Sequence, residues 1–382
     1  MKIIILGCGL VGGPMAIDLA KNKQFNVSIA DINKVSLEKL KINAGNLKIK
    51  TICADLSRSN TIKKLVSDYD IVVNSLPGSI GFQTLKVIIE AGKNVIDIAF
   101  FPEDPFQLDK LAKKQGVIAI VDCGVAPGMS NLLVGYADSM LNKTETAIIY
   151  VGGLPVKRDW PYEYKAVFSP ADVIEEYTRP AQYIENGKLV IRPALTDAEY
   201  IDFPKIGTLE AFNTDGLRTI ANTIKATNLK EKTLRYPGHI EKIVVLRETG
   251  FFSKEKIEIQ GIKIRPLDFT SKLLFPKWKL NQGEQDFTVM KVIIEGIKNG
   301  GKIRYTYDLL DYYDSKTDTH SMARTTGYTA TAAVNLLAQN LYKKTGISPP
   351  EFLGKLPECV KYILNYLKKR NVIYTETISS IE

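Results

Sequence analysis

Lys2-Ile-Ile-Ile-Leu-Gly-Cys-Gly-Leu-Val-Gly-Gly-Pro-Met-Ala16 opens the chain and carries its strongest structural signal. The β-branched run at 3–6 predicts a buried parallel strand, and a glycine turn follows before a helical pattern begins. Strand, glycine turn and helix in this order are typical of a dinucleotide-binding unit. Gly7 permits the tight turn, Gly9 lets the backbone approach a pyrophosphate, and Gly12 lets the helix pack close to the sheet. The turn residues expected to bind a cofactor are Gly7, Gly9, Leu10, Val11 and Gly12.

A carboxylate further along the chain strengthens this interpretation. Residues 26–30 predict a second strand that ends in Asp31. A carboxylate at that strand end can accept hydrogen bonds from an adenosine ribose and repels a 2′-phosphate, so NAD is favoured over NADP. A packing turn or a secretory signal peptide is the alternative, but glycines interrupt the apolar region and helix signals continue through Asp18.

Composition restricts the class of protein. The 382 residues are 45% hydrophobic and 24% charged, as in an ordinary globular protein with two domains. The net charge of +9 is scattered along the chain, and an anionic cofactor accounts for it without nucleic acid. Residues 117–137 form the longest weakly charged stretch, and we read it as strand, loop and helix, not as a membrane span.

Four cysteines without a CxxC pair and only two histidines, His239 and His320, make a metal site or a disulfide framework unexpected. A cytoplasmic location is therefore expected.

The first third of the chain alternates between strands and helices. Strands are predicted at 2–6, 26–30, 48–53, 70–74, 94–98 and 117–122, and helices at 13–22, 34–43, 58–67, 79–91 and 104–115. This alternation predicts an α/β fold with a Rossmann-type doubly wound parallel sheet. Ligands of such sheets bind at the carboxyl ends of the strands.

Polar residues at those strand ends are candidate site residues. Asp55 contacts adenine or caps the helix that follows it. The next segment lines the nicotinamide ribose or only turns the chain; it consists of Asn74, Ser75, Leu76, Pro77 and Gly78. Asp97 and Asp122 end the last two strands, and Cys123 lies beside Asp122.

The pattern changes after Pro127-Gly128. A helix near 130–140 leads to a strand at 147–151, and short strands then alternate with aromatic loops to about Asp314. This predicts an inserted α+β substrate and dimerisation domain. Helices from Thr329 to about Lys344 and over 357–369 return to the first domain. The predicted divisions are 1–127, 128–321 and 322–382.

Several segments share a characteristic order and spacing, namely Asp122-Cys-Gly-Val-Ala-Pro-Gly128, Gly152-Gly-Leu-Pro155, Tyr164-Lys165, Ala181-Gln-Tyr183 with Gly187-Lys188, Phe212-Asn-Thr-Asp215 and Thr233-Leu-Arg-Tyr-Pro-Gly238. Through them nearly the whole chain resembles one family, the saccharopine dehydrogenase-like reductases. The branch of NAD-dependent lysine 6-dehydrogenases is the most similar, through 161–170, 210–219 and 321–327. One departure separates the branches: this chain has Asn213-Thr214-Asp215 where saccharopine-forming members carry Asn-Arg-Asp. The arginine expected to hold an extra carboxylate is missing, which favours lysine as substrate.

The resemblance implies oxidation of the ε-amine of L-lysine to the 6-semialdehyde, which cyclises to Δ1-piperideine-6-carboxylate, in a homodimer. Lysine starts as an ammonium, so a base is required, and Asp97 and Asp122 are the catalytic candidates. Cys123 lines the pocket or packs the core. For the α-carboxylate and α-amino group the candidate residues are Lys165, Asn213, Asp215, Arg218 and Arg235, with the arginines ranked above the lysine.

His239 is a weaker second candidate base, and the segment 321–327 faces the cofactor or caps the helix after it. Two other functions stay open: a saccharopine or opine-type reductase, and a redox sensor that binds NAD without turnover. No nucleic acid or membrane partner is expected.

Overall fold

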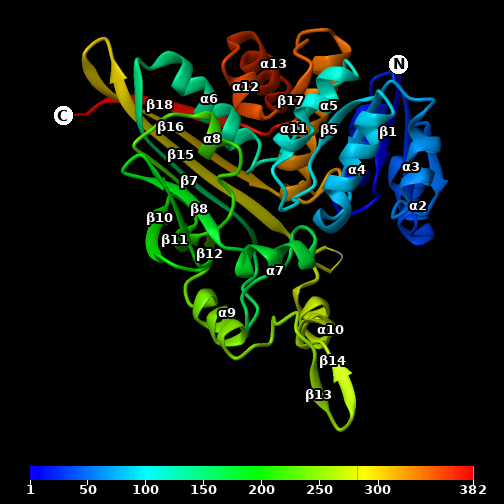
Figure 1. Ribbon diagram of the computed structural model, residues 1–382, viewed down its shortest axis with the longest axis horizontal. Helices are drawn as coiled ribbons and strands as arrows, with labels where there is room; N and C mark the ends of the chain where they lie inside the picture. The colour runs from blue at the N-terminus through cyan, green and yellow to red at the C-terminus, as the bar shows by residue number, and fades with distance from the viewer. Residues whose placement is uncertain (282, 382) are drawn as a thin grey trace. The chain divides into compact units, whose positions relative to one another are not determined.

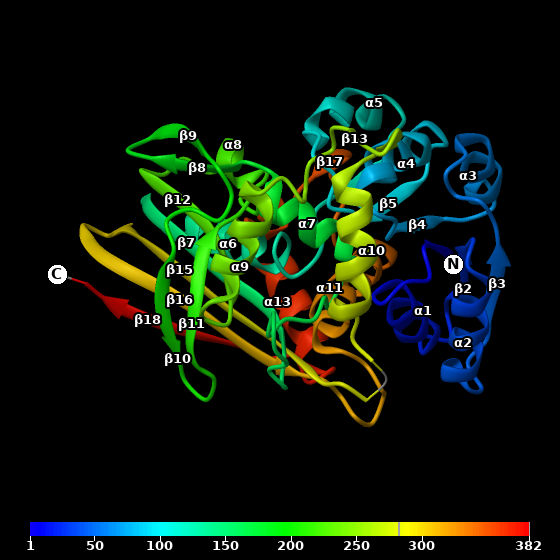
Figure 2. The same cartoon turned by 90° about the horizontal axis from the view of Figure 1, so that it is seen from below.

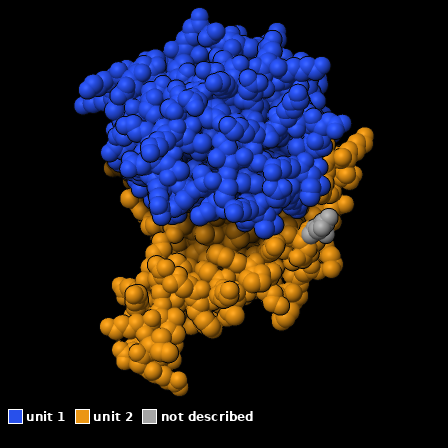
Figure 3. Space-filling view, turned by 90° about the vertical axis from the view of Figure 1, so that its right-hand side faces the viewer, with its two compact units in different colours: residues 1–142, 322–374 blue, residues 143–321, 375–382 orange. Residues whose placement is uncertain are grey.

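The computed structural model describes residues 1–281 and 283–381, which form two compact units (Figure 3). Unit 1 consists of residues 1–142 and 322–374, and unit 2 consists of residues 143–321 and those from 375 onward. The division differs from the predicted one at two places. Helix α6 (Met129–Met140) belongs to unit 1, and the last strand, β18 (Tyr374–Ser380), lies almost wholly in unit 2.

Unit 1 contains a parallel sheet of seven strands in the order β17-β6-β5-β4-β1-β2-β3 (Figure 1). Its strands are β1 (Lys2–Leu6), β2 (Asn26–Asp31), β3 (Ile49–Cys53), β4 (Ile71–Asn74), β5 (Asn94–Asp97), β6 (Ile118–Ile120) and β17 (Gly346–Ser348). The predicted α/β fold with a doubly wound parallel sheet is confirmed. Strand β1 pairs with both β2 and β4, so the strand order reverses there, and ligands of open α/β sheets bind at this switch point.

The helices of unit 1 follow the strands as the alternation predicts. They are α1 (Gly12–Ala20), α2 (Lys34–Ala44), α3 (Ser59–Val66), α4 (Gly78–Glu90) and α5 (Asp109–Lys114), which a 3₁₀ turn at Pro105–Leu108 precedes. Residues 3–6 are fully buried, because a parallel sheet is covered on both faces. The Asn33 side chain accepts hydrogen bonds from the backbone of Val35 and Ser36 and fixes the start of α2.

The C-terminal part of unit 1 adds α11 (Ser321–Ala338), α12 (Pro350–Gly354) and α13 (Pro357–Lys368). The predicted start of a helix at Thr329 is wrong by eight residues, and the segment 321–327 is the first part of α11 instead of a loop before it. Threonine hydroxyls are satisfied inside the helix, since Thr329 Oγ1 donates to the Thr325 carbonyl at 2.7 Å. The buried Asp18 of α1 accepts hydrogen bonds from Thr331 and Tyr366 and pairs with Arg370.

Unit 2 is built on a mixed sheet of nine strands, seven of them in the order β10-β11-β12-β7-β15-β16-β18 (Figures 1 and 2). Besides β18, whose range is given above, the sheet contains β7 (Lys143–Pro155), β8 (Ala181–Glu185), β9 (Lys188–Arg192), β10 (Glu199–Phe203), β11 (Gly207–Asn213), β12 (Asn228–Arg235), β15 (Asp286–Lys298) and β16 (Gly301–Tyr312). Strands β7 and β12 are parallel, while β7 and β15 form a long antiparallel pair. The predicted α+β character of this region is confirmed.

Helices and one hairpin complete unit 2. They are α7 (Pro170–Thr178), α8 (Ile220–Thr223), α9 (His239–Glu248), α10 (Pro266–Trp278) and the hairpin of β13 (Ile257–Ile259) and β14 (Ile262–Ile264). The fully buried Trp278 and Tyr177 join α7, α9 and α10 in one apolar cluster. This cluster also surrounds the charged residues of the candidate site in unit 2.

Candidate active site

The glycine turn after β1 has the geometry that the sequence predicts. Gly7 has a φ of +103°, and a Cβ there would lie 2.8 Å from the Ser75 carbonyl oxygen. A Cβ on Gly12 would lie 2.1 Å from the Gly7 carbonyl oxygen, so only glycine lets α1 approach the strand so closely. Apart from its chain neighbours, no residue of the described chain has an atom within 4 Å of a Cβ built on Gly9. The turn is therefore packed tightly on one side and open at Gly9, which fits a dinucleotide pyrophosphate at the N-terminus of α1.

Asp31 ends β2 beside this turn. Its carboxylate accepts hydrogen bonds from the backbone N–H of Cys8 at 2.6 Å and of Asn33 at 2.7 Å. A negative charge thus lies against the turn, where an adenosine ribose would lie in a Rossmann-type fold. Burial and the Asp31 charge raise the pKa of the Cys8 thiol to about 11, so that thiol stays protonated at neutral pH.

The segment that follows β4 holds the glycine turn in place. Ser75 Oγ donates to the Leu6 and Gly7 carbonyl oxygens at 2.8 and 3.2 Å. The buried Asn74 amide donates to Asp97 at 2.6 Å, and a Cβ on Gly78 would lie 2.2 Å from a backbone oxygen of the β5 loop. The polar side chains therefore face protein atoms, and the predicted contact of residues 74–78 with a cofactor would use backbone atoms.

Asp55, after β3, shapes a loop. Its carboxylate accepts from the Ser57 N–H at 3.1 Å and hydroxyl at 2.6 Å, and it pairs with Arg58 at 2.9 Å. The Ser57 hydrogen bonds lower the pKa of this carboxyl. Arg58, not Asp55, occupies the N-cap position of α3, so the prediction that Asp55 caps this helix is wrong. Contact with adenine stays a prediction.

Asp97, Asp122 and Cys123 come together at the carboxyl ends of β5 and β6. Asp97 and Asp122 are 0% and 2% exposed, and the Cys123 N–H donates to the Asp97 backbone oxygen at 2.9 Å. Asp122 has a φ of +50°, an uncommon conformation for a residue with a side chain that often marks a functional site. Burial, with Asp97 and Asp122 nearby, raises the pKa of Cys123 far above its usual range. Its thiol lies 4.0 Å from the Thr329 oxygen of α11 and is no nucleophile at neutral pH.

Arg235 is the centre of a buried network in unit 2. It is 3% exposed, and its guanidinium contacts Glu176 at 2.9 Å and the Tyr177 hydroxyl at 3.0 Å. The Tyr164 ring lies 4.5 Å from the guanidinium carbon in a cation–π contact, and the Leu234 oxygen accepts a further hydrogen bond. The arginine fork is thus already paired with a carboxylate, and a substrate carboxylate would have to displace Glu176.

His239 belongs to the same network. One ring nitrogen contacts the Tyr177 hydroxyl and the other the Tyr162 carbonyl, both at 2.9 Å. Burial and the charge of Arg235 lower the pKa of His239 to about 3, so the imidazole is neutral. A base so weak is unsuited to deprotonating an ammonium, and the geometry fits the structural role.

The segment Asn213-Thr214-Asp215 follows β11 and contacts a buried acid. Thr214 Oγ1 lies 2.6 Å from Glu231 Oε2 and 2.8 Å from the Thr233 hydroxyl, and the Gly216 N–H donates to the same Glu231 oxygen. Burial raises the pKa of Glu231 from 4.5 to about 8. A carboxyl group therefore lies beside the position where saccharopine-forming members carry an arginine.

The remaining substrate-binding candidates of unit 2 have separate partners. Asn213 donates to Asp197 at 2.8 Å, and its buried Oδ1 has no hydrogen-bond partner in the described part of the chain. Asp215 lies 3.5 Å from Arg179, and Lys165 lies 3.6 Å from Glu284. Arg218 has a φ of +53° in the turn before α8.

Sequence reasoning missed four residues that contact the candidates of unit 2, namely Glu176, Tyr177, Arg179 and Glu231. Glu231, Thr233 and Arg235 alternate along β12, and such period-2 spacing of polar residues in a strand is the signal that could have shown a common face. Because β12 was not predicted as a strand, the spacing carried no meaning.

Among the described residues, no group of His, Cys, Asp and Glu side chains could hold a metal ion. All four cysteines are free thiols. A helix both apolar and long enough to cross a bilayer is absent from residues 1–281 and 283–381.

The fold and the glycine turn together define a Rossmann-type dinucleotide-binding protein with a second, mixed-sheet unit. The family model described as saccharopine dehydrogenase NADP binding domain matches residues 3–120, and the saccharopine dehydrogenase C-terminal domain matches residues 124–373. The chain belongs to the saccharopine dehydrogenase family of oxidoreductases, as the resemblance implied.

Individual relatives differ in how much of their length is matched. Carboxyaminopropylagmatine dehydrogenase of Synechocystis is 25% identical over 94% of this chain and 95% of its own. The L-glutamate-forming, NADP(+) saccharopine dehydrogenase of Schizosaccharomyces pombe is 28% identical over 66% of this chain and 58% of its own. The mouse mitochondrial alpha-aminoadipic semialdehyde synthase is 24% identical over 70% of this chain and 30% of its own length.

Among solved structures, apo saccharopine dehydrogenase (L-Glu forming) of Saccharomyces cerevisiae matches with a TM-score of 0.78, at 20% identity and full coverage of both chains. At this identity the likeness shows the fold, and the substrate has to be argued from the residues.

Proposed function

We propose that this protein is an NAD-dependent dehydrogenase that oxidises the ε-amine of L-lysine to the 6-semialdehyde, which cyclises to Δ1-piperideine-6-carboxylate. The observation that carries the proposal is the contact between Thr214 and Glu231. Saccharopine has two carboxylates more than lysine, and these need cationic partners in a closed site. A threonine bonded to a buried acid provides none at this position.

Asp31 supports NAD as the cofactor, because its carboxylate beside the glycine turn would accept ribose hydroxyls and repel a 2′-phosphate. When bound, NAD would accept the hydride from the carbon that carries the amine. The proposal departs here from the NADP in the names of the family model and of the S. pombe enzyme, so it is open to direct test.

Removal of a proton is the task assigned to Asp97 and Asp122. An alkyl ammonium with a pKa of about 10.4 has no lone pair to assist loss of a hydride. Asp97 is oriented by hydrogen bonds from the Asn74 amide and from the Ala99 N–H, the latter at 2.7 Å. Asp122 lies in a turn and has a positive φ. Both are positioned before any substrate arrives, as a general base requires.

A second candidate is a dehydrogenase of a carboxyl-bearing secondary amine, such as saccharopine or carboxyaminopropylagmatine. The match over nearly the full length of the Synechocystis enzyme favours it. Arg235 would then release Glu176 and hold a substrate carboxylate. A homodimer and a cytoplasmic location are part of the proposal.

The test is a comparison of kcat/KM for L-lysine, saccharopine and carboxyaminopropylagmatine, each with NAD and NADP, followed by the absorbance of the reduced cofactor. We expect the highest value for lysine with NAD, and trapping of the product by o-aminobenzaldehyde. A higher value for either secondary amine would contradict the lysine assignment, and no turnover of any would favour the redox sensor.

A further inference from the structure

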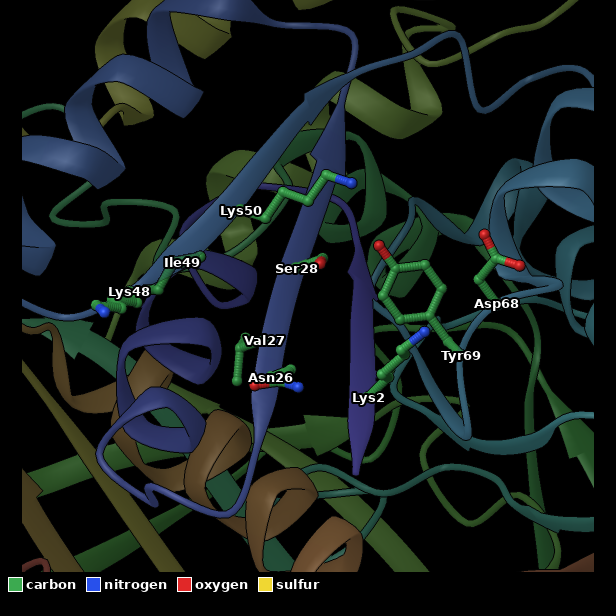
Figure 4. A pocket seen from close by; sticks show the side chains of 9 residues that line it. All are labelled: Lys2, Asn26, Val27, Ser28, Lys48, Ile49, Lys50, Asp68 and Tyr69. Carbon is green, nitrogen blue, oxygen red and sulfur yellow. The ribbon is translucent and has the colours of Figure 1, made fainter.

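A pocket of about 460 Å³ lies at the amino ends of β1, β2 and β3 in unit 1 (Figure 4). The residues that line it are Lys2, Asn26, Val27, Ser28, Lys48, Ile49, Lys50, Asp68 and Tyr69. The glycine turn follows the opposite, carboxyl end of β1, roughly 15 Å away along a five-residue strand. The pocket is therefore separate from the predicted dinucleotide site.

The strand register explains why cationic side chains gather there. Lys2 pairs with Asn26, and Ser28 pairs with Lys50 on the neighbouring strand. Side chains two residues apart in a strand share a face, so Lys48 extends the same row. Figure 4 shows the Lys50 side chain extending toward the Tyr69 ring and Lys2 beside that ring, while Lys48 lies at the far rim.

The three ammonium groups have no carboxylate within salt-bridge distance in residues 1–281 and 283–381. Asp68 is the acidic residue among the lining residues, and the Asp70 carboxylate accepts a hydrogen bond from the Lys2 backbone N–H at 2.7 Å, so three positive charges lie near two negative ones. Exposed lysines are usually well separated from one another or paired with a carboxylate, because neighbouring like charges repel one another. This arrangement leaves a net attraction for an anion.

The hydroxyls of two largely buried residues add a second observation. Ser28 is 5% and Tyr69 is 8% exposed, and within the described chain neither hydroxyl has a protein hydrogen-bond partner. The two oxygens are not among the fully buried unpaired atoms of the described chain, so both hydroxyls open toward the pocket. Both line the pocket, so they offer hydrogen bonds to a molecule held between the lysines.

We propose that this pocket binds a small anion with at least two negative charges of the phosphate class, such as pyrophosphate or a phosphate monoester. Lysine ammoniums act on phosphate as point charges, and the hydroxyls donate to its oxygens. The proposal does not depend on the proposed function of the chain.

Calorimetric titration of the full chain with inorganic pyrophosphate at low salt tests this proposal, with and without saturating dinucleotide. We expect binding that dinucleotide does not abolish, that weakens about tenfold in Lys2→Gln/Lys50→Gln, and that fades toward 1 M salt. Lys50→Arg should retain binding. Tyr69→Phe, which keeps the ring, should weaken it by a smaller factor.

The matched control is Lys110→Gln/Lys114→Gln, which removes the same charge from exposed positions of α5. Equal affinities of the two double variants would overturn the proposal, as would loss of all binding when dinucleotide is present. Much tighter, pocket-dependent binding of a short single-stranded oligonucleotide would also overturn it, in favour of a nucleic-acid surface.

Discussion

The candidate site of unit 1 is built mainly from backbone geometry, whereas that of unit 2 is built from long charged side chains that hold one another. Around the glycine turn, Gly7 and Gly12 are required by contacts of a few ångströms, and Ser75 fixes the turn from the next strand. In unit 2, the buried ion pair of Arg235 and Glu176 and the buried Glu231 carboxyl depend on their partners. Removal of a site side chain in unit 1 should therefore change mainly the activity. Removal of one in unit 2 should change mainly the stability of the fold.

The largest effect is expected at the proposed base. Asp122→Asn and Asp97→Asn keep the shape of the side chain but cannot take up the substrate proton, so kcat should fall about 100-fold to 10,000-fold in at least one of them. Steady-state kinetics across pH measures this. Glu90→Gln, an exposed change at the end of α4, is the control. Wild-type kcat in both aspartate variants would remove the base assignment.

The Arg235 network should respond in stability first. Arg235→Ala leaves Glu176 buried without its cation and should lower the free energy of unfolding by about 3–5 kcal/mol. Combining Arg235→Met with Glu176→Gln removes both charges and should recover much of that loss. Urea unfolding measures both, and the KM for lysine of the folded fraction shows whether Arg235 also binds substrate. A loss below about 1 kcal/mol would argue against a stabilising pair.

Glu231 predicts a pH dependence of stability. Its pKa is raised in the folded protein from 4.5 to about 8, so the folded state binds a proton more tightly than the unfolded chain. The stability this provides is complete below pH 4.5 and is lost as the pH rises through 8. Glu231→Gln should therefore gain stability relative to wild type between pH 5 and 8, by about 1–3 kcal/mol. Thermal unfolding at both pH values measures it, with Glu258→Gln on β13 as control; a constant difference would contradict the prediction.

The smallest effect is expected in cofactor choice. Asp31→Ser removes the carboxylate that would accept ribose hydroxyls and repel a 2′-phosphate, so the ratio of kcat/KM for NAD to that for NADP should fall by about tenfold or more. The ratio in wild type is the reference. Equal use of NADP by the unmodified protein would show that Asp31 does not select the cofactor.

The sequence was enough to predict the strands of the first 122 residues of unit 1 because their signals are local. Buried β-branched runs, glycines and strand-end aspartates lie within a few residues of the elements they define, and the predicted strands agree with β1 to β6 within a residue or two. Strand β17 was missed, since three residues at 346–348 carry no pattern of their own and pair with β6 across more than two hundred residues.

The site in unit 2 could be predicted only in part. Arg235 and Thr214 were found through family-like motifs, but their partners Glu176 and Glu231 come from α7 and from an unpredicted strand. Such pairs depend on how distant segments pack. A carboxylate beside an arginine changes what that arginine can bind. No pattern of neighbouring residues in the sequence indicates such a pairing.

The last strand of the unit 1 sheet also determines when that unit can be completed. During synthesis residues 1–142 emerge first, yet β17 and α11, whose buried Thr331 contacts Asp18 of α1, follow only after nearly all of unit 2 has been made. The nascent chain must hold an incomplete parallel sheet, with β6 as an exposed edge, while about 200 further residues are added before β17 is made, at roughly 5–20 residues per second. The unit that starts the chain is therefore completed only near the end of synthesis, just before β18 completes unit 2, and a chaperone that protects this edge would act during those seconds.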